Sequence, residues 1–288
     1  ARADPTRGGA GPPVLRCAAV RRALLVLLAL AATLAVAGAA TWALLPDPAA
    51  VARRYPRTTA IVEQRRAEAA ALHRPFRPSQ RWVGLEAISP RLVQAVLLSE
   101  DAGFYVHGAF DTHEVWTAAE QHLREGKRLR GASTLTQQAA RTLWLGTRRS
   151  WWRKGKEAVL AVKMERALPK RRILALYLNT VEWGDGVFGA EAAARRWFGV
   201  PASSLDTAQA VVLASMLPAP RRADLRAPPR WLARRSRRLL DRMLAAGRID
   251  AGEHARAGAE LGWILAGASG PEEPPAPDEE AAATTAAR

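Results

Sequence analysis

The chain has 288 residues, enough for one sizeable domain with appendages. Its formal net charge of +16 favours a polyanionic partner, which could be a nucleic acid, an anionic membrane face or a phosphorylated substrate. The single cysteine excludes an internal disulfide, and the sequence has no Cys/His spacing typical of a structural zinc site.

The N-terminal part predicts a membrane anchor. Residues 1–22 are rich in Gly, Pro and Arg and predict a disordered basic tail. Residues 23–45 contain no charged residue, and this run is longer than the ~20 residues that a helix needs to cross a bilayer. Because arginines precede the run, the positive-inside rule places the tail in the cytoplasm and the remaining chain outside it. A cleaved signal peptide is the alternative, although its apolar core usually has only ~7–15 residues.

The rest of the chain predicts a mainly α domain. Residues 46–81 predict a membrane-proximal connector with a polar helix over 60–72. The domain is expected over residues 82–267, followed by a disordered, acidic, Pro/Ala-rich tail over 268–288. Helical periodicity, caps and breakers define its helices. They are predicted at 90–99, 112–125, 134–144, 151–168, 170–179, 188–197, 206–217 and 229–246.

An acid ends the first of these domain helices. The helix opens with Ser89 and Pro90, a typical cap and first helical residue. Its apolar face runs through Val93 and Val96 to Glu100, so this carboxylate is expected on the apolar face. A carboxylate in apolar surroundings suits a general acid or base at neutral pH. The alternative is that the helix ends there and that Glu100 points to solvent.

A second acid, Glu157, shares a helix face with Leu160 and Met164. Arg153 and Lys154 precede it, and such cations favour the ionised carboxylate. Two carboxylates in unlike environments are typical of a site in which one transfers a proton and the other orients a group or stabilises charge. The alternative is an ordinary helical ion pair with one of the two cations.

Between the two acids, residues 131–141 predict a helix that begins at a glycine turn. Thr134 and Gln137 have the spacing of a capping box. A helix start with small hydroxylated residues such as Ser133 and Thr134 can bind a phosphate or a sugar hydroxyl. The alternative is that these two residues only cap the helix.

In order along the chain, these segments resemble the peptidoglycan glycosyltransferase family, which polymerises lipid II. Five motifs between Trp82 and Met243 carry the resemblance. They are Glu100-Asp101-x-x-Phe104-x-x-His107, Gly131-x-Ser133-Thr134-x-Thr136-Gln137-Gln138, Arg153-Lys154-x-x-Glu157, Lys170-x-x-Ile173-Leu174-x-x-Tyr177-Leu178-Asn179 and Leu213-Ala214-x-x-Leu217-Pro218-x-Pro220.

The resemblance implies a lysozyme-like glycosyltransferase domain and an inverting transfer. Glu100 would act as the general base on the 4-hydroxyl of a lipid II GlcNAc. This hydroxyl attacks C1 of the MurNAc at the end of the growing chain and expels polyprenyl diphosphate. Glu157 would be the second catalytic carboxylate, orienting a cation or the acceptor sugar. The other implied substrate-binding residues are Asp101, His107, Ser133, Thr134, Gln137, Arg141, Arg149, Arg153, Lys154 and Lys163.

The resemblance also implies the partners and the location. No cofactor is required and no protein metal site is expected, although Mg²⁺ or Mn²⁺ at the pyrophosphate is compatible with the reaction. The substrates are lipid II and the growing glycan chain at the bacterial inner membrane, with a single-pass anchor and a periplasmic catalytic domain. Neither Ser-x-x-Lys nor Lys-Thr-Gly occurs, so a monofunctional enzyme is expected. Penicillin-binding transpeptidases and divisome or elongasome proteins would then be the cross-linking partners.

Two other functions remain open at this point. A lysozyme-like lytic enzyme also uses a Glu in a cleft, but it would not need the cations around Glu157. A membrane-anchored basic binding or scaffold protein could use Trp151, Trp152, Arg153 and Lys154 to stack on and bind nucleic acid. The expected topology places this segment outside the cytoplasm, which argues against a nucleic-acid partner.

Overall fold

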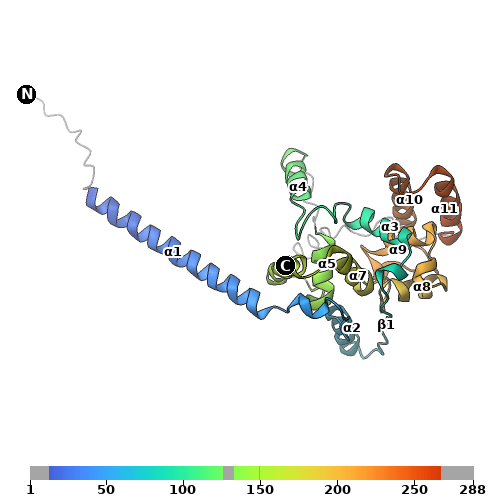
Figure 1. The fold of residues 1–288 in the computed structure, drawn as a ribbon, viewed down its shortest axis with the longest axis horizontal. Coiled ribbons are helices and arrows are strands. Elements are labelled where there is room, and N and C mark those ends of the chain that lie inside the picture. The colour runs from blue at the N-terminus through green and yellow to red at the C-terminus, as the bar shows by residue number, and fades with distance from the viewer. Residues whose placement is uncertain (1–12, 126–132, 149, 267–288) are drawn as a thin grey trace, which may run out of the picture. The chain divides into compact units, whose positions relative to one another are not determined.

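The computed structural model describes residues 13–125, 133–148 and 150–266 (Figure 1). The chain divides into two compact units, one ending at Pro46 and one beginning at Asp47. The first unit contains a single long helix. The second contains the remaining helices and one very small sheet.

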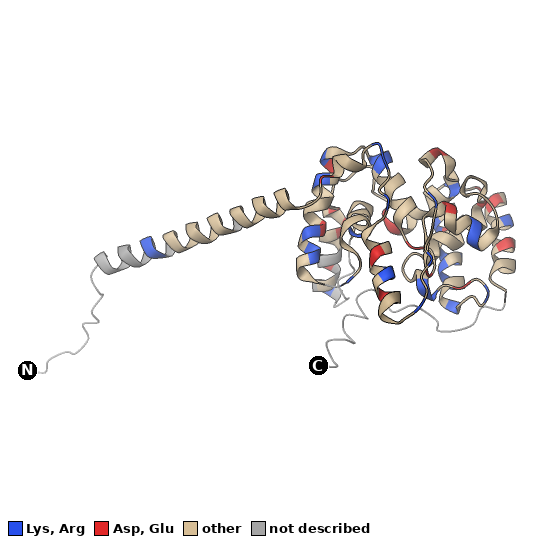
Figure 2. Ribbon diagram, turned by 90° about the horizontal axis from the view of Figure 1, so that it is seen from below, with Lys and Arg blue, Asp and Glu red and all other residues tan. Residues whose placement is uncertain are grey.

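Helix α1 runs over Pro13–Leu44 and includes almost all of the predicted anchor. It begins earlier than the apolar run because the preceding Ala, Leu and Arg residues are good helix formers behind an N-terminal Pro. After Arg21 and Arg22, the described part of α1 carries no charged residue (Figure 2). Among the described residues, this is the one helix that is long and apolar enough to cross a membrane.

The second unit is mainly helical, as the sequence predicts. Its two-residue strands, β1 (Ser79–Gln80) and β2 (Val187–Phe188), pair in parallel with Ser79 opposite Val187. Its α-helices are α2 (Ala60–Ala71), α3 (Pro90–Glu100), α4 (Thr112–Glu125), α5 (Leu135–Ala140), α6 (Trp151–Ala167), α7 (Lys170–Thr180), α8 (Ala190–Phe198), α9 (Thr207–Met216), α10 (Arg230–Ala245) and α11 (Ala251–Ile264).

Two helices form the centre of the core. In α7, every residue from Ile173 to Thr180 is buried, and α9 is buried along almost its whole length. Helices α3, α10 and α11 pack against α9, whereas α5 packs against α7 and α6. The two acids singled out in the sequence therefore lie on helices that the core holds in place.

The helix predicted at 134–144 changes type before its C-terminal end. Helix α5 ends at Ala140 and continues as a π-helical turn over Arg141–Leu145. This turn ends at Gly146, which has a φ of 72°. A Cβ there would lie 2.4 Å from Oε1 of Gln64 in α2, so a side chain at this position would displace the Gln64 amide, which binds the N–H of Thr147. Packing against α2, which the local sequence does not reveal, decides where this helix ends.

Two further differences follow from tertiary contacts. The helix predicted from residue 188 begins at Ala190, because Val187 and Phe188 pair with β1 and Gly189 has a φ of 83°. Helix α11 is not in the predicted set. Its mixed small and charged sequence has a weak apolar face, of which only Ala257 and Leu261 are buried.

Candidate active site

Glu100 is the last residue of α3, where the helix meets the rest of the site. Its side chain is only 14% exposed, so it is neither fully buried nor turned to solvent. The Ser99 hydroxyl donates to its Oε1 over 3.1 Å, and Nε2 of Gln138 donates to its Oε2 over 3.4 Å. Nη2 of Arg235 lies 3.4 Å from Oε1. The carboxylate is thus fixed by three donors yet still reachable from solvent.

Asp101 follows directly and joins the end of α3 to the start of α5. Its Oδ2 accepts from the backbone N–H of Leu135 over 2.8 Å, and its Oδ1 lies 2.7 Å from Nε2 of His107. The other ring nitrogen of His107 lies 2.8 Å from the carbonyl oxygen of Gly108. Burial lowers the pKa of His107, but the hydrogen bonds to Asp101 and to Gly108 outweigh it and raise this pKa above the ordinary value. Both ring nitrogens face acceptors, which favours the imidazolium form.

Thr134 and Gln137 hold the start of α5 against the loop after Glu100. The Thr134 hydroxyl accepts from the backbone N–H of Gln137 over 3.3 Å and donates to the carbonyl oxygen of Ala109 over 3.0 Å. The Gln137 side chain also donates to this carbonyl, over 3.2 Å. The predicted cap at Thr134 is confirmed, but the full capping box is wrong. The Gln137 side chain binds Ala109 and Lys154 instead of reaching back to the cap.

Glu157 is completely buried on α6, with 0% of its side chain exposed. Arg153 forms an ion pair with its Oε2, and Nζ of Lys154 lies 2.7 Å from its Oε1. Lys154 also donates to Oγ of Ser133 over 3.0 Å and to Oε1 of Gln137 over 3.3 Å. The predicted cations around Glu157 are confirmed. They form helical ion pairs with it, which the sequence analysis gave as the alternative to a catalytic role. Because 45% of the Lys154 side chain is exposed, its charge remains accessible.

The start of α5 links the two acids into one hydrogen-bonded chain. Nε2 of Gln138 donates both to Glu100 and to the carbonyl oxygen of Ser133, each over 3.4 Å. The Ser133 hydroxyl in turn accepts from Lys154, which binds Glu157. Seven of the predicted site residues therefore lie with the two glutamates in one connected set. These are Asp101, His107, Ser133, Thr134, Gln137, Arg153 and Lys154.

The other three predicted site residues are not part of this connected set. Arg141 begins the π-helical turn, and its buried Nε has no hydrogen-bond partner among the described residues. Its charge lowers the pKa of Tyr177, but burial and the nearby Glu100 charge raise this pKa well above the ordinary value. Lys163 is half-buried on α6 and is not among the described contacts of Glu157. Arg149 lies outside the described residues.

Sequence reasoning missed Arg235 and the role of Tyr177. The Tyr177 hydroxyl, kept protonated by burial, donates to Oε1 of Gln138 over 3.1 Å and so orients the amide that binds Glu100. Arg235 belongs to α10, in which arginines are so frequent that none stands out. Only the packing of α10 against α3 selects this one.

Arginines also fix both ends of α3. At the C-terminal end, Nη2 of Arg242 donates to the carbonyl oxygen of Leu98 over 2.7 Å. At the first turn, Nη2 of Arg91 lies 2.6 Å from Oε2 of Glu253 in α11, and its Nη1 donates to the carbonyl oxygen of Arg248 over 2.9 Å. The helix that carries Glu100 is therefore tied to α10 and α11.

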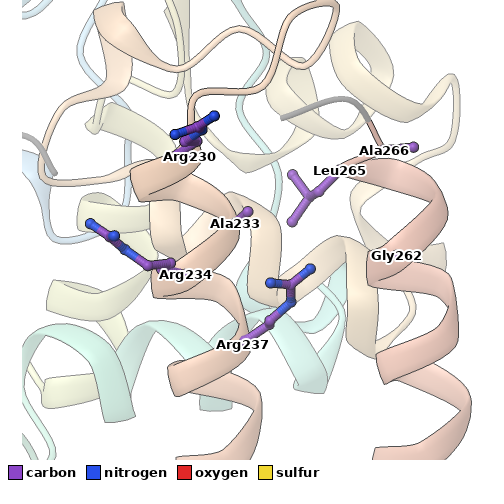
Figure 3. Close-up of a pocket in the computed structure, with 7 residues that line it drawn as sticks. All are labelled: Arg230, Ala233, Arg234, Arg237, Gly262, Leu265 and Ala266. Atoms are coloured by element: carbon purple, nitrogen blue, oxygen red, sulfur yellow. The ribbon is translucent and has the colours of Figure 1, made fainter. Parts of the chain in front are cut away.

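A separate cavity of about 480 Å³ lies between α10 and α11 (Figure 3). Arg237 and Leu265 extend into the space between the two helices. None of the residues that line it carries a carboxylate, so this cavity offers no general base. They are Arg230, Ala233, Arg234, Arg237, Gly262, Leu265 and Ala266.

The connected set around Glu100 and Glu157 has the parts needed for transfer to a hydroxyl with an anionic leaving group. It offers a reachable carboxylate that can accept a proton and fixed cations that can stabilise developing negative charge. Within the described part of the chain, no group of three His, Cys, Asp or Glu side chains is placed to hold a metal ion.

Comparisons with known proteins agree with this chemistry. The family model described as Transglycosylase matches residues 67–244, beginning within α2 and thus earlier than the motifs alone suggest. A curated protein of Laribacter hongkongensis, named biosynthetic peptidoglycan transglycosylase, is 44% identical over 188 residues, covering 65% of this chain and 82% of that protein. A protein of the same name from Rhodospirillum centenum is 48% identical over 171 residues, covering 59% and 73%. Because the family model spans more than half of the chain, the chain belongs to the transglycosylase family.

Proposed function

We propose that this protein is a peptidoglycan glycosyltransferase that polymerises lipid II into glycan strands and releases polyprenyl diphosphate. The observation that carries the proposal is the hydrogen-bonded chain through α5 from Glu100 to the cations around Glu157. It joins a general base and a site for an anionic leaving group in one arrangement. The printed names of the relatives, biosynthetic peptidoglycan transglycosylase, support the substrate class.

Glu100 would remove the proton from the 4-hydroxyl of the acceptor GlcNAc as this oxygen bonds to C1 of the donor MurNAc. A carboxylate has about four lone-pair sites. The described donors occupy two on Oε1 and one on Oε2. Oε2 therefore retains a site for the incoming proton. Attack from the face opposite the leaving group inverts the configuration at C1.

Lys154 and Arg153 would stabilise the charge that develops on the departing pyrophosphate. Fixed cations in a partly dry site stabilise such charge without reorganising. Glu157 would act by orienting both cations, since it is buried and has no path to the sugar. A lytic enzyme that cleaves an uncharged glycosidic bond has no comparable use for these cations.

The leaving group itself would bind any Mg²⁺ or Mn²⁺, because such ions usually coordinate substrate phosphates through one or two carboxylates and water. Polymerisation assayed with and without EDTA tests whether an ion contributes.

The substrates carry polyprenyl tails, and the chain has features suited to a membrane surface. Helix α1 could hold the enzyme in the inner membrane, with the catalytic unit in the periplasm. Large apolar side chains are also exposed in the segment after Glu100 and at the start of α6. Such side chains typically insert into the membrane interface. They are Tyr105, Val106, Phe110, Val115, Trp116, Trp151 and Trp152.

Polymerisation of labelled lipid II by purified protein in detergent tests the proposal. The native chain should make long strands that lysozyme digests. Glu100→Gln should slow strand formation by about 10²–10⁴-fold, the usual contribution of a general base. Glu86→Gln, at an exposed acid outside the site, is the matched control and should leave the rate unchanged.

Two outcomes would overturn the proposal. One is an unchanged rate in Glu100→Gln. The other is cleavage of preformed peptidoglycan, without strand synthesis, by the native chain.

A further inference from the structure

Arg235 is the one described cation that contacts Glu100. Its Nη2 lies 3.4 Å from Oε1 of Glu100 and 3.1 Å from the hydroxyl oxygen of Ser99. The same Ser99 hydroxyl donates to Oε1 of Glu100 over 3.1 Å. Guanidinium, hydroxyl and carboxylate thus form a closed triangle on one side of the carboxylate.

The position of this guanidinium is set by the fold and not by the local sequence. Helix α10 buries Trp231, Leu239 and Met243 in the core and packs against α9 and α3. Arg235 extends from this anchored helix to the C-terminal end of α3, and its side chain is about one-third exposed, at 32%. A charge held by a rigid helix acts on a neighbouring carboxylate without first having to be ordered.

We propose that Arg235 is a positioning residue for Glu100: by binding Oε1 it turns Oε2 toward the acceptor hydroxyl. The inference rests on the proposed function, because it assigns a role through the general base. Arg235 and Ser99 both bind Oε1, whereas the lone-pair site left for the proton is on Oε2. Oε1 is thus filled by two donors, whereas Oε2 has one, from Gln138, and keeps a site for the proton.

A purely structural role explains the contact less well. The link between α10 and α3 is already made by Arg242, whose Nη2 donates to the carbonyl oxygen of Leu98 over 2.7 Å. An ion pair between groups as exposed as Arg235 adds little to stability. Its charged contact with the base has no substitute among the described residues, since the other donors to Glu100, from Ser99 and Gln138, are neutral.

The test compares Arg235→Gln and Arg235→Lys with Arg242→Gln in the lipid II polymerisation assay. Arg242 is a matched control because it lies on the same helix and contacts the same end of α3, but binds a backbone carbonyl. Three quantities are measured for each full-length variant: kcat, KM and the melting temperature. Glu100→Gln is assayed in parallel.

We expect Arg235→Gln to lower kcat by about tenfold or more with KM within about twofold, since the interaction acts on the base and not on substrate binding. Arg235→Lys should restore most of kcat. Arg242→Gln should lower only the melting temperature.

Three results would overturn the inference and leave the proposed function intact. One is an unchanged kcat in Arg235→Gln, with Glu100→Gln inactive, which would remove the role of Arg235. A raised KM with unchanged kcat would make Arg235 a substrate contact. A loss of activity equal to that in Arg242→Gln, with matching losses of melting temperature and no rescue by Arg235→Lys, would make it structural. An unchanged rate in Glu100→Gln would instead overturn the proposed function, and the inference with it.

Discussion

At the scale of single residues, Glu100 and Glu157 differ in their exposure to solvent and not in whether a cation lies beside them. Both lie next to cations, but Glu157 has 0% of its side chain exposed, whereas Glu100 retains 14%. A base must reach a substrate proton, so of these two glutamates Glu100 is the one that fits the proposed role. The sequence predicts both acids on apolar helix faces, yet it contains no signal for this difference in access. The difference comes from how α5 and α6 pack together.

His107 gives a prediction about pH. Its raised pKa means that the folded chain binds the proton more tightly than the unfolded chain, whose His has a pKa near 6.5. The resulting stabilisation is fully present below this value and is lost as pH rises through the folded pKa. The melting temperature of the native chain should therefore exceed that of His107→Gln most at low pH, and the gap should narrow above pH 6.5. Thermal melts of both proteins across this range measure it, and a gap that widens with pH would contradict it.

At the scale of elements, the short helix α5 connects the segments that make up the site. Its first residues contact Asp101, Ala109 and Lys154, which belong to three different segments. The cap at Thr134 was predictable, because a hydroxyl before a helix has a local chemical reason to be there. The contacts made by Gln137 and Gln138 were not predictable, since an amide side chain can bind almost any polar neighbour.

The other elements also divide into those with a local sequence signal, which were predictable, and those set by tertiary contacts, which were not. Helices with strong periodicity or clear caps, such as α3 and α9, agree closely with their predicted ranges. The early end of α5, the late start of α8 and the presence of α11 depend on Gln64, on strand pairing and on packing against α9 and α10. These contacts join residues far apart in the sequence, and no local pattern encodes them.

Thr134→Ala should separate the cap's effect on the site from its effect on stability. Losing an N-cap costs about 1 kcal/mol of stability. At Thr134 it also removes one of the two hydrogen bonds to the carbonyl of Ala109, so activity should fall more than the loss of folded protein explains. The control is Asp250→Ala, which removes the cap of α11. Oδ1 of Asp250 accepts from the N–H of Glu253 over 2.7 Å. Urea denaturation and polymerisation assays should show similar destabilisation but reduced turnover only for Thr134→Ala. Equal turnover in the two variants would contradict this expectation.

At the scale of the whole molecule, the chain combines one apolar helix with a basic catalytic unit. The apolar helix precedes the family domain in the sequence. By the positive-inside rule, its basic start and uncharged continuation predict a direction of insertion. The strongly basic composition would suit an anionic lipid surface.

The single native cysteine allows the predicted orientation to be measured. Cys17 precedes the apolar run, so a membrane-impermeant maleimide should label it only after the inner membrane is opened. In a Cys17→Ser background, Ala246→Cys places a thiol at an exposed position of the catalytic unit. This thiol should react once the outer membrane alone has been made permeable. The reverse pattern of labelling would place the catalytic unit in the cytoplasm.

The arginine contacts at both ends of α3 have a mechanical consequence. Arg91 ties its first turn to α11, and Arg235 and Arg242 tie its last turn to α10. A shift of α3 would therefore break contacts with both helices at the C-terminal end of the domain. On the proposed function, Glu100 would then hold its place through the catalytic cycle, and the substrates would be the parts that move.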